Sequence, residues 1–391
     1  MDPRRAQVWA AAHSETMSIT TLRDGKALYS MTAPRRAAAL GLSVLLAISS
    51  CAITGSDAAT PGAADGTRVA GSEATSTPTA PLTTSASSAT AGGSRGGNGM
   101  PMSAAAAPAA KPVIVTFAGD IAAGTAGTGA YRSALATGNL VRRIAPRWAL
   151  LGGDNAYFSG TLAEYRAKYH PTWGSFRAIS KPVPGNHEYR TRGAAGYRQY
   201  FFAGASRPYH VFSAGNHWRV YLLNCEIACG TGSAQERWLR KDLAAHPTAH
   251  VLAVVHRPRY SSGLHGNDAR VTAMWNALLS AKADVMLAGH DHDYEVFAKQ
   301  DARGKGRPAD GIKEFVNGTG GAEMYPFGKP RPNSLKRLNR DFGVLKLSLG
   351  TTSYSWQFIS SGYCWTGRER AACPSRTGKV LDFGRRRTNR G

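Results

Sequence analysis

Aromatic residues are nearly absent from the first 110 of the 391 residues. This stretch has no Phe, and Trp9 and Tyr29 are its only aromatic side chains. Residues 52–110 consist mainly of Ala, Thr, Ser, Gly and Pro, which bury too little apolar surface to offset the entropy lost on ordering. We therefore interpret residues 52–110 as a disordered linker. The remaining residues, 111–391, are enough for one domain with a single core.

Acidic residues are also scarce: 25 Asp and Glu stand against 48 Lys and Arg, for a formal charge of +23. Such an excess attracts anions, including phosphate esters, acidic lipid head groups and nucleic acid. A GC-rich genome that favours Arg explains the same excess. No basic run is interleaved with aromatics, so we expect no specific nucleic-acid partner. We interpret the cluster Arg385 to Arg387 as a solvated tail.

Long hydrophobic runs are missing. The twelve uncharged residues 37–48 would span about 18 Å as a helix, well short of the roughly 30 Å core of a bilayer. A permanent transmembrane helix is therefore not predicted here. Because Arg35 and Arg36 precede the run and small residues follow it, the pattern is typical of a signal peptide. We assign residues 1–51 to a signal peptide with an upstream extension.

The end of this run, Ile48-Ser49-Ser50-Cys51, resembles a bacterial lipobox, in which the cysteine receives lipid. Ordinary cleavage nearby is the alternative. The paired arginines also fit the twin-arginine export route. We therefore expect an exported protein, either anchored to the bacterial cell envelope through Cys51 or secreted or periplasmic.

Cysteine is rare: four cysteines remain besides Cys51, an even number for an exported chain. The default expectation is two disulfides, which four cysteines can form in three different ways. We favour the local pairs Cys225 with Cys229 and Cys364 with Cys373. A CxxxC pair without a second Cys or His pair is weak support for a zinc site.

Polar, metal-competent residues follow the predicted apolar strands. Asp120, Asp154, Asn186, His256 and His290 each come just after an apolar run, at separations of 34, 32, 70 and 34 residues. A βαβ unit takes about 30 residues, and strand ends in such a sheet meet at one edge. The sequence therefore brings five metal-competent groups together.

The wider pattern predicts a βαβ half followed by a mixed, largely antiparallel half. The expected strands are residues 113–117, 148–151, 209–212, 218–223, 251–255, 285–288, 312–316, 343–349 and 352–359, and helical spacing surrounds 140–144, 162–169 and 235–245. Asp291, Asp293 and Glu295 lie beyond His290. They either support a metal-bound imidazole by hydrogen bonding or occupy solvated positions of an alternating strand.

Carboxylates, an amide oxygen and imidazoles without thiolate suit iron, zinc or manganese. Tyr157, three residues after Asp154, extends this set. A carboxylate shared by two cations lets them lie about 3.5 to 4 Å apart and stabilise both oxygens of an in-line displacement at phosphorus. The residues thus indicate phosphate ester hydrolysis.

Five short segments, in order along the chain, carry a family resemblance. They are Gly119-Asp120, Gly153-Asp154-Asn155-Ala156-Tyr157, Gly185-Asn186-His187-Glu188, Val255-His256 and Gly289-His290-Asp291-His292. Together they resemble the motifs of calcineurin-like metallophosphoesterases, specifically the purple acid phosphatase branch, over residues 112–360. The resemblance implies an α/β (α+β) fold, a four-layer αββα sandwich of two mixed sheets flanked by helices. The low-complexity residues 52–110 make this resemble a compact bacterial member.

The resemblance also implies a division of the ligands between two metal ions. One ion would be held by Asp120, Asp154, Tyr157 and His292, and the other by Asp154, Asn186, His256 and His290. Many relatives have a histidine two positions after the first aspartate, where this chain has Ala122; Tyr157 supplies the missing ligand. A phenol with a pKa of about 10 binds as phenolate only to a strongly acidic cation, which favours Fe(III) there and a divalent Fe, Zn or Mn beside it.

Two further histidines are expected at the site. His187 directly follows a predicted ligand, and the resemblance makes it a phosphate contact and leaving-group acid. His265 lies in a loop that resembles one offering a second histidine, with a solvent-facing position as the alternative. We therefore expect an exported phosphomonoesterase. A phosphodiesterase of the same superfamily and a non-catalytic, anion-binding surface lipoprotein are the alternatives, and the sequence leaves the oligomeric state open.

Overall fold

The computed structural model describes residues 16–21, 27–32, 110–204 and 208–391. The chain divides into two units, Met1–Ala106 and Ala107–Gly391. In the first unit, strand β1 (Thr16–Thr21) pairs antiparallel with β2 (Ala27–Thr32). The predicted signal sequence around residues 35–51, the lipid site Cys51 and linker residues 52–109 lie outside the described residues. No helix in the described part of the chain is both long and apolar enough to cross a bilayer.

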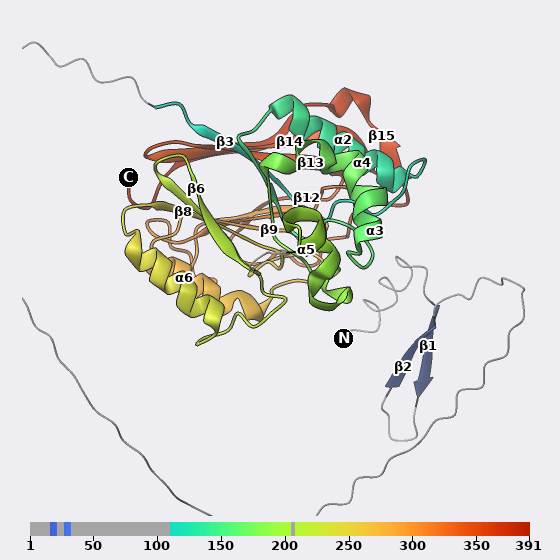
Figure 1. Ribbon diagram of the computed structural model, residues 1–391, viewed down its shortest axis with the longest axis horizontal. Helices are drawn as coiled ribbons and strands as arrows, with labels where there is room; N and C mark the ends of the chain where they lie inside the picture. The colour runs from blue at the N-terminus through green and yellow to red at the C-terminus, as the bar shows by residue number, and fades with distance from the viewer. Residues whose placement is uncertain (1–15, 22–26, 33–109, 205–207) are drawn as a thin grey trace, which may run out of the picture. The chain divides into compact units, whose positions relative to one another are not determined.

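The second unit contains two mixed β-sheets, shown in Figure 1. The first sheet has the strand order β15-β14-β13-β3-β4-β5, and β16 also pairs with β14. Strands β3, β4 and β5 are parallel, whereas the C-terminal strands add antiparallel. Its strands are β3 (Val113–Ala118), β4 (Trp148–Leu151), β5 (Ser180–Pro182), β13 (Asp341–Leu349), β14 (Ser353–Trp365), β15 (Arg370–Ala372) and β16 (Val380–Arg387).

The second sheet has the order β12-β10-β11-β9-β8-β7-β6. Its four central strands, β7, β8, β9 and β11, are parallel. Most other strand pairs from β6 onward are antiparallel, which confirms the expectation of a mixed, largely antiparallel second half of the chain. The helices α6 and α7 connect β7 to β8 and β8 to β9, and helical crossovers make successive strands parallel. Its strands are β6 (His210–Ala214), β7 (Trp218–Leu222), β8 (His250–Val255), β9 (Val285–Ala288), β10 (Tyr294–Phe297), β11 (Lys313–Asn317) and β12 (Ser334–Leu338).

Helices cover the outer face of each sheet. The main ones are α2 (Gly129–Ile144), α3 (Leu162–Glu164), a π-helix (Tyr165–Tyr169), α4 (His170–Trp173), α5 (Ala195–Phe202), α6 (Ala234–Ala245) and α7 (Thr272–Ser280). Buried residues of α2, α4 and α5 pack on the first sheet, and those of α6 and α7 pack on the second. A third apolar cluster lies between the sheets. These layers confirm the predicted αββα sandwich.

Strand β13 shows how the sequence builds this arrangement. Leu345, Leu347 and Leu349 belong to the cluster between the sheets, whereas the alternate residues Lys346 and Ser348 are half-exposed on the outer side. This alternation is the period of a strand with one face buried. The nearly continuous apolar sequence of α7 lacks such a pattern, which is why that helix was not predicted.

The C-terminal residues form a strand rather than the solvated tail predicted for Arg385 to Arg387. Strand β16 pairs with β14, with Arg387 opposite Ser353. The carboxylate of Asp382 in β16 accepts hydrogen bonds from Trp356 Nε1 at 2.9 Å and Tyr294 Oη at 2.7 Å. These bonds anchor the basic segment to both sheets. Basic residues are common on exposed edge strands as well as in solvated tails, so the charged sequence did not reveal this strand.

Both predicted disulfides are present. Cys225 bonds to Cys229, and Cys364 bonds to Cys373. The first closes a loop after β7, and the second links β14 to the residues after β15.

The contact between the sheets makes a stability prediction. Phe358 is fully buried and its ring stacks on Tyr294, with ring centroids 4.1 Å apart, whereas Phe383 is 75% exposed. We expect Phe358→Ala to lower the free energy of unfolding by about 3 to 5 kcal/mol. Phe383→Ala, the matched control, should change it by less than about 0.5 kcal/mol. Urea denaturation of both variants checks this, and equal losses would contradict the assigned core.

Candidate metal centre

The predicted ligands lie where strand ends of two sheets meet. Asp120, Asp154 and Asn186 follow β3, β4 and β5 of the first sheet, while His256 and His290 follow β8 and β9 of the second. The sequence argument placed all five residues at the edge of one sheet. Their convergence is correct, but they come from the edges of two different sheets. The backbone N–H of His290 donates to Asp120 Oδ2 at 2.8 Å, which ties the two edges together.

Four side-chain atoms converge in a first ligand set, defined as Asp120, Asp154, Tyr157 and His292. The Tyr157 hydroxyl lies 3.0 Å from Asp120 Oδ1, 3.0 Å from His292 Nε2 and 3.4 Å from Asp154 Oδ2. His292 Nε2 is also 3.3 Å from Asp120 Oδ1. All four residues are buried. The structure therefore brings together the residues that the resemblance assigned to one ion.

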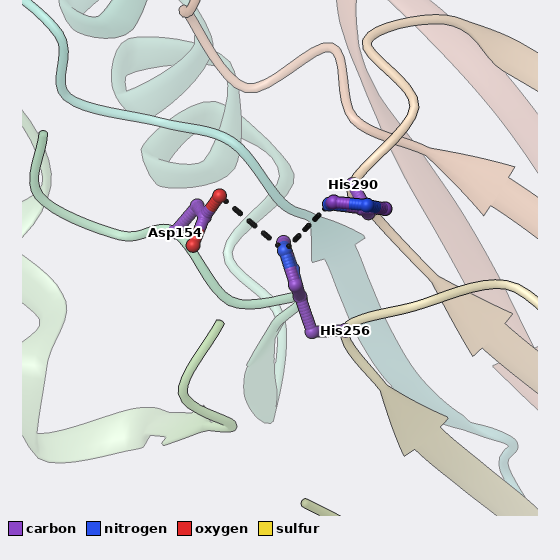
Figure 2. Close-up of side chains that lie close together, drawn as sticks. All are labelled: Asp154, His256 and His290. Carbon is purple, nitrogen blue, oxygen red and sulfur yellow. Dashed lines mark hydrogen bonds and ion pairs between the residues drawn. The ribbon is translucent and has the colours of Figure 1, made fainter. Parts of the chain in front are cut away.

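A second ligand set comprises Asp154, Asn186, His256 and His290. Figure 2 shows His256 between Asp154 and His290, with its Nε2 3.3 Å from Asp154 Oδ2 and 3.1 Å from His290 Nδ1. The same Nε2 lies 3.1 Å from Asn186 Oδ1. Ligand atoms of Asp154, His256 and His290 all lie within 4.8 Å of one another. Oδ2 of Asp154 contacts Tyr157 of the first set and His256 of the second, so this carboxylate lies between the two sets.

The hydrogen bonds of two imidazoles fit ligation of a cation. His256 Nδ1 lies 2.8 Å from the carbonyl oxygen of Gly152, and His292 Nδ1 lies 2.5 Å from that of Glu323. A carbonyl only accepts, so Nδ1 of each ring carries a proton, and in the neutral ring Nε2 presents a lone pair to the site. Backbone partners of this kind orient metal-ligating histidines. With His292 neutral, the first set has four atoms with lone pairs directed at one another and only the phenol proton between them. Such an arrangement suits a metal ion.

His290 is arranged differently. The Arg257 guanidinium donates to its Nε2 at 2.7 Å and is itself held by Glu226, with Nε to Oε1 at 2.6 Å and NH2 to Oε2 at 3.1 Å. A neutral His290 therefore carries its proton on Nδ1. Ligation through Nδ1 requires that proton to move to Nε2 and Arg257 to turn away.

The electrostatics favour positive charge between the carboxylates. Burial lowers the pKa of His256, but Asp154 and Asp120 outweigh burial and raise this pKa to about 10. Asp120 likewise holds the pKa of His292 above its ordinary value despite burial. Burial, with the nearby Asp120 and Asp154, raises the pKa of Tyr157 well above its ordinary value. Ionising Tyr157 thus needs a cation that compensates both effects.

The backbone is constrained at the ligands themselves. Asp120, Asp154 and His290 adopt left-handed conformations, with φ of 59°, 49° and 69°. Such conformations are unfavourable for residues other than Gly and concentrate at functional sites. Gly185 leaves room for its neighbour, because a Cβ there would lie 2.2 Å from Asp154 Oδ1. A glycine in this motif is therefore required by the position of the carboxylate.

Glu188 holds the loop that carries Asp154. This buried carboxylate accepts hydrogen bonds from five donors: the backbone N–H groups of Asp154, Asn155, Ala156 and Gly185, at 2.7 to 3.2 Å, and the Tyr165 hydroxyl at 2.9 Å. Burial and the charge of Asp154 raise the pKa of Glu188 to about 7, while its donors oppose that rise. Glu188 therefore links two motifs of the sequence through one carboxylate.

Both predicted non-ligand histidines lie at the centre. His187 Nδ1 is 2.7 Å from the carbonyl oxygen of Phe158, which leaves Nε2 facing Asp154 Oδ2 at 3.8 Å. The ring of His265 stacks on His290 at a centroid distance of 4.1 Å, and its Nδ1 lies 3.0 Å from Asp291 Oδ1. Its side chain remains 29% exposed. Burial lowers the pKa of His187 below its ordinary value.

Three acidic residues after His290 and one aromatic residue lie buried at the centre. Asp291, Asp293 and Glu295 are fully buried rather than solvated, and Asp291 also accepts from Ser261 Oγ at 2.5 Å and the Gly266 N–H at 3.1 Å. Asp291 thus holds the loop that carries His265. Tyr325 stacks on His292 with centroids 4.0 Å apart. Glu188 and Asp291 stand inside recognised motifs, whereas nothing in the sequence singles out Tyr325.

Comparison with known proteins agrees with this geometry. Residues 105–294 match the family model of the calcineurin-like phosphoesterases. The chain is 27% identical to purple acid phosphatase 22 of Arabidopsis thaliana over 297 residues, a match that covers 67% of this chain and 64% of that protein. The chain therefore spans less than two thirds of that relative's length.

Two solved structures share the fold. Purple acid phosphatase PPD1 from yellow lupin seeds superposes with a TM-score of 0.55 at 16% identity, covering 70% of this chain and 53% of PPD1. GAP50, the anchor in the inner membrane complex of Plasmodium, gives 0.53 at 14% identity, covering 71% of this chain and 90% of GAP50. Residues 105–294 belong to the calcineurin-like phosphoesterase family. The similarity of the chain to purple acid phosphatases supports that branch of the family.

The role of Glu188 can be tested through stability. Glu188→Gln keeps the size of the side chain but offers one acceptor oxygen, so backbone donors now served by the second oxygen lose their acceptor. We expect the free energy of unfolding to fall by about 3 kcal/mol. Glu369→Gln, at an exposed position, should change it by less than about 0.5 kcal/mol. Urea titrations measure both, and a Glu188→Gln protein as stable as the control would refute the scaffold role.

Proposed function

We propose that this protein is an exported phosphatase that uses two metal ions to hydrolyse phosphomonoesters. The observation that carries the proposal is the pair of ligand sets that share Asp154 Oδ2, which contacts Tyr157 on one side and His256 on the other. A carboxylate in this position can bridge two cations. The match to the phosphoesterase family and the similarity to a purple acid phosphatase support the same reading.

The two sets would each hold one ion. Asp120, Asp154, Tyr157 and His292 would suit Fe(III), because a buried phenol binds as phenolate only to a strongly acidic cation. Asp154, Asn186, His256 and His290 suit a divalent Fe, Zn or Mn. When bound, the ions supply Lewis acidity to the phosphoryl oxygens.

The chain itself supplies the proton for the leaving group. The carbonyl of Phe158 fixes Nδ1 of His187 as a donor, so a protonated His187 carries its second proton on Nε2, on the side of Asp154. From there it donates to the departing oxygen. Asp291 fixes Nδ1 of His265 in the same manner and leaves Nε2 for a substrate oxygen.

Export belongs to the same proposal and rests on the sequence of residues 35–51 alone. The lipobox-like Ile48-Ser49-Ser50-Cys51 supports a lipid anchor on Cys51, with ordinary cleavage as the alternative. The anchor would place the enzyme at the bacterial cell envelope, and ordinary cleavage would release it as a secreted or periplasmic protein.

Activity and colour together test the proposal. The iron-loaded protein should hydrolyse p-nitrophenyl phosphate and show a violet phenolate-to-ferric band. Tyr157→Phe should lose the band, because it removes the phenolate, and Asp154→Ala should lose turnover. Absorbance spectra and initial rates on the same samples provide the measurement. Hydrolysis of diesters but not monoesters would make the protein a phosphodiesterase, and a metal-loaded sample without turnover would leave only anion binding.

The acid role of His187 predicts a dependence on the leaving group. An alkyl phosphate needs protonation of its leaving oxygen far more than a nitrophenyl phosphate does. His187→Ala should therefore slow hydrolysis of glycerol 2-phosphate by about 10² to 10⁴-fold and that of p-nitrophenyl phosphate much less. Steady-state kinetics with both esters measure the difference, and equal losses would argue against an acid at this position.

A further inference from the structure

An exposed aromatic ring stands beside the metal centre. Phe158 directly follows the buried Tyr157 and is itself 49% exposed. The other large exposed apolar side chains of the described residues, Leu335, Val380 and Phe383, lie on β12 and β16. Burying a Phe side chain is worth about 1.5 to 3 kcal/mol, so packing does not account for a ring left in solvent.

The backbone of Phe158 is nevertheless firmly held. Its N–H donates to Glu164 Oε1, and its carbonyl accepts from His187 Nδ1 at 2.7 Å. Glu164 Oε2 also accepts from the N–H groups of Ser159 at 3.0 Å and Thr161 at 3.1 Å. The ring therefore projects from a fixed loop.

The position of the ring relates it to the leaving group. Its centroid lies 6.2 Å from that of His187 and 5.8 Å from that of Tyr157. In the proposed function His187 protonates the departing oxygen, so the group attached to that oxygen leaves beside Phe158. Lys168 Nζ lies 5.5 Å from the ring centroid, and this cation supports the ring from within the fold.

We propose that Phe158 is a specificity-determining residue that stacks on an aromatic or heteroaromatic ring of the leaving alcohol. This inference rests on the proposed phosphomonoesterase function and names its substrate class. Aromatic pairs favour offset or edge-to-face contact with centroids about 4.5 to 7 Å apart, and they contribute more than burial of the same area. A saturated ring of equal size gains only the burial.

Two esters of matched size isolate this contact. Benzyl phosphate and cyclohexylmethyl phosphate both release a primary alcohol, so they differ mainly in the aromaticity of the ring. The ratio of their kcat/KM values should be about 2- to 10-fold higher for the wild-type protein than for Phe158→Leu or Phe158→Ala. The change should fall in KM more than in kcat, because the contact forms in the ground state as well. Phe383→Ala, the other exposed Phe, should leave the ratio unchanged.

Binding separates failure of the subsite from failure of the function. Calorimetry with benzylphosphonate and cyclohexylmethylphosphonate, which are not hydrolysed, should show the same loss of discrimination in both Phe158 variants. If no ester is turned over but this loss is seen, the catalytic proposal fails and the aromatic subsite stands. An unchanged ratio in folded Phe158→Leu and Phe158→Ala, in kinetics and in binding, overturns the inference.

Discussion

The carboxylate of Asp154 has to remain ionised and fixed in the interior, and the surrounding residues are arranged to meet that demand. Burial disfavours its charge, yet His256 and His187 hold its pKa below the ordinary value. The backbone N–H of His187 donates to Oδ1 at 2.8 Å, while Oδ2 faces Tyr157 and His256. Taking a carboxylate out of water is costly unless such partners compensate, so the motif residues support one another.

Two other buried carboxylates fix the loops of the centre without facing the ligand sets. Glu188 fixes the loop that bears Asp154, and Asp291 fixes the loop that bears His265. Both are buried carboxylates: Glu188 accepts mainly from backbone N–H groups, and Asp291 accepts equally from backbone and side-chain donors. Removing either would leave several donors unpaired, which is why these acidic residues act through position rather than through contact with substrate.

Much of this arrangement is predictable from sequence, and particular residues show where prediction ends. The strands 148–151 and 285–288 follow from short apolar runs bounded by turn residues, and the ligands follow from the polar residues after them. The sequence argument assumed one sheet, because spacing along the chain does not reveal that β3 and β8 belong to different sheets. Tyr325 reaches the centre through tertiary packing, whereas Phe158 lies there because it follows Tyr157, and a single aromatic residue carries no pattern that identifies its role. The strand at Val380–Arg387 was hidden by its charge.

The central claim is that Asp154 joins two cation sites. Crystals of the protein loaded with iron and zinc, measured at the absorption edge of each element, test it most directly. The account predicts two anomalous peaks about 3.5 to 4 Å apart, both in contact with Asp154 and one also with Tyr157. A single peak, or a pair in which Asp154 contacts only one ion, would contradict it.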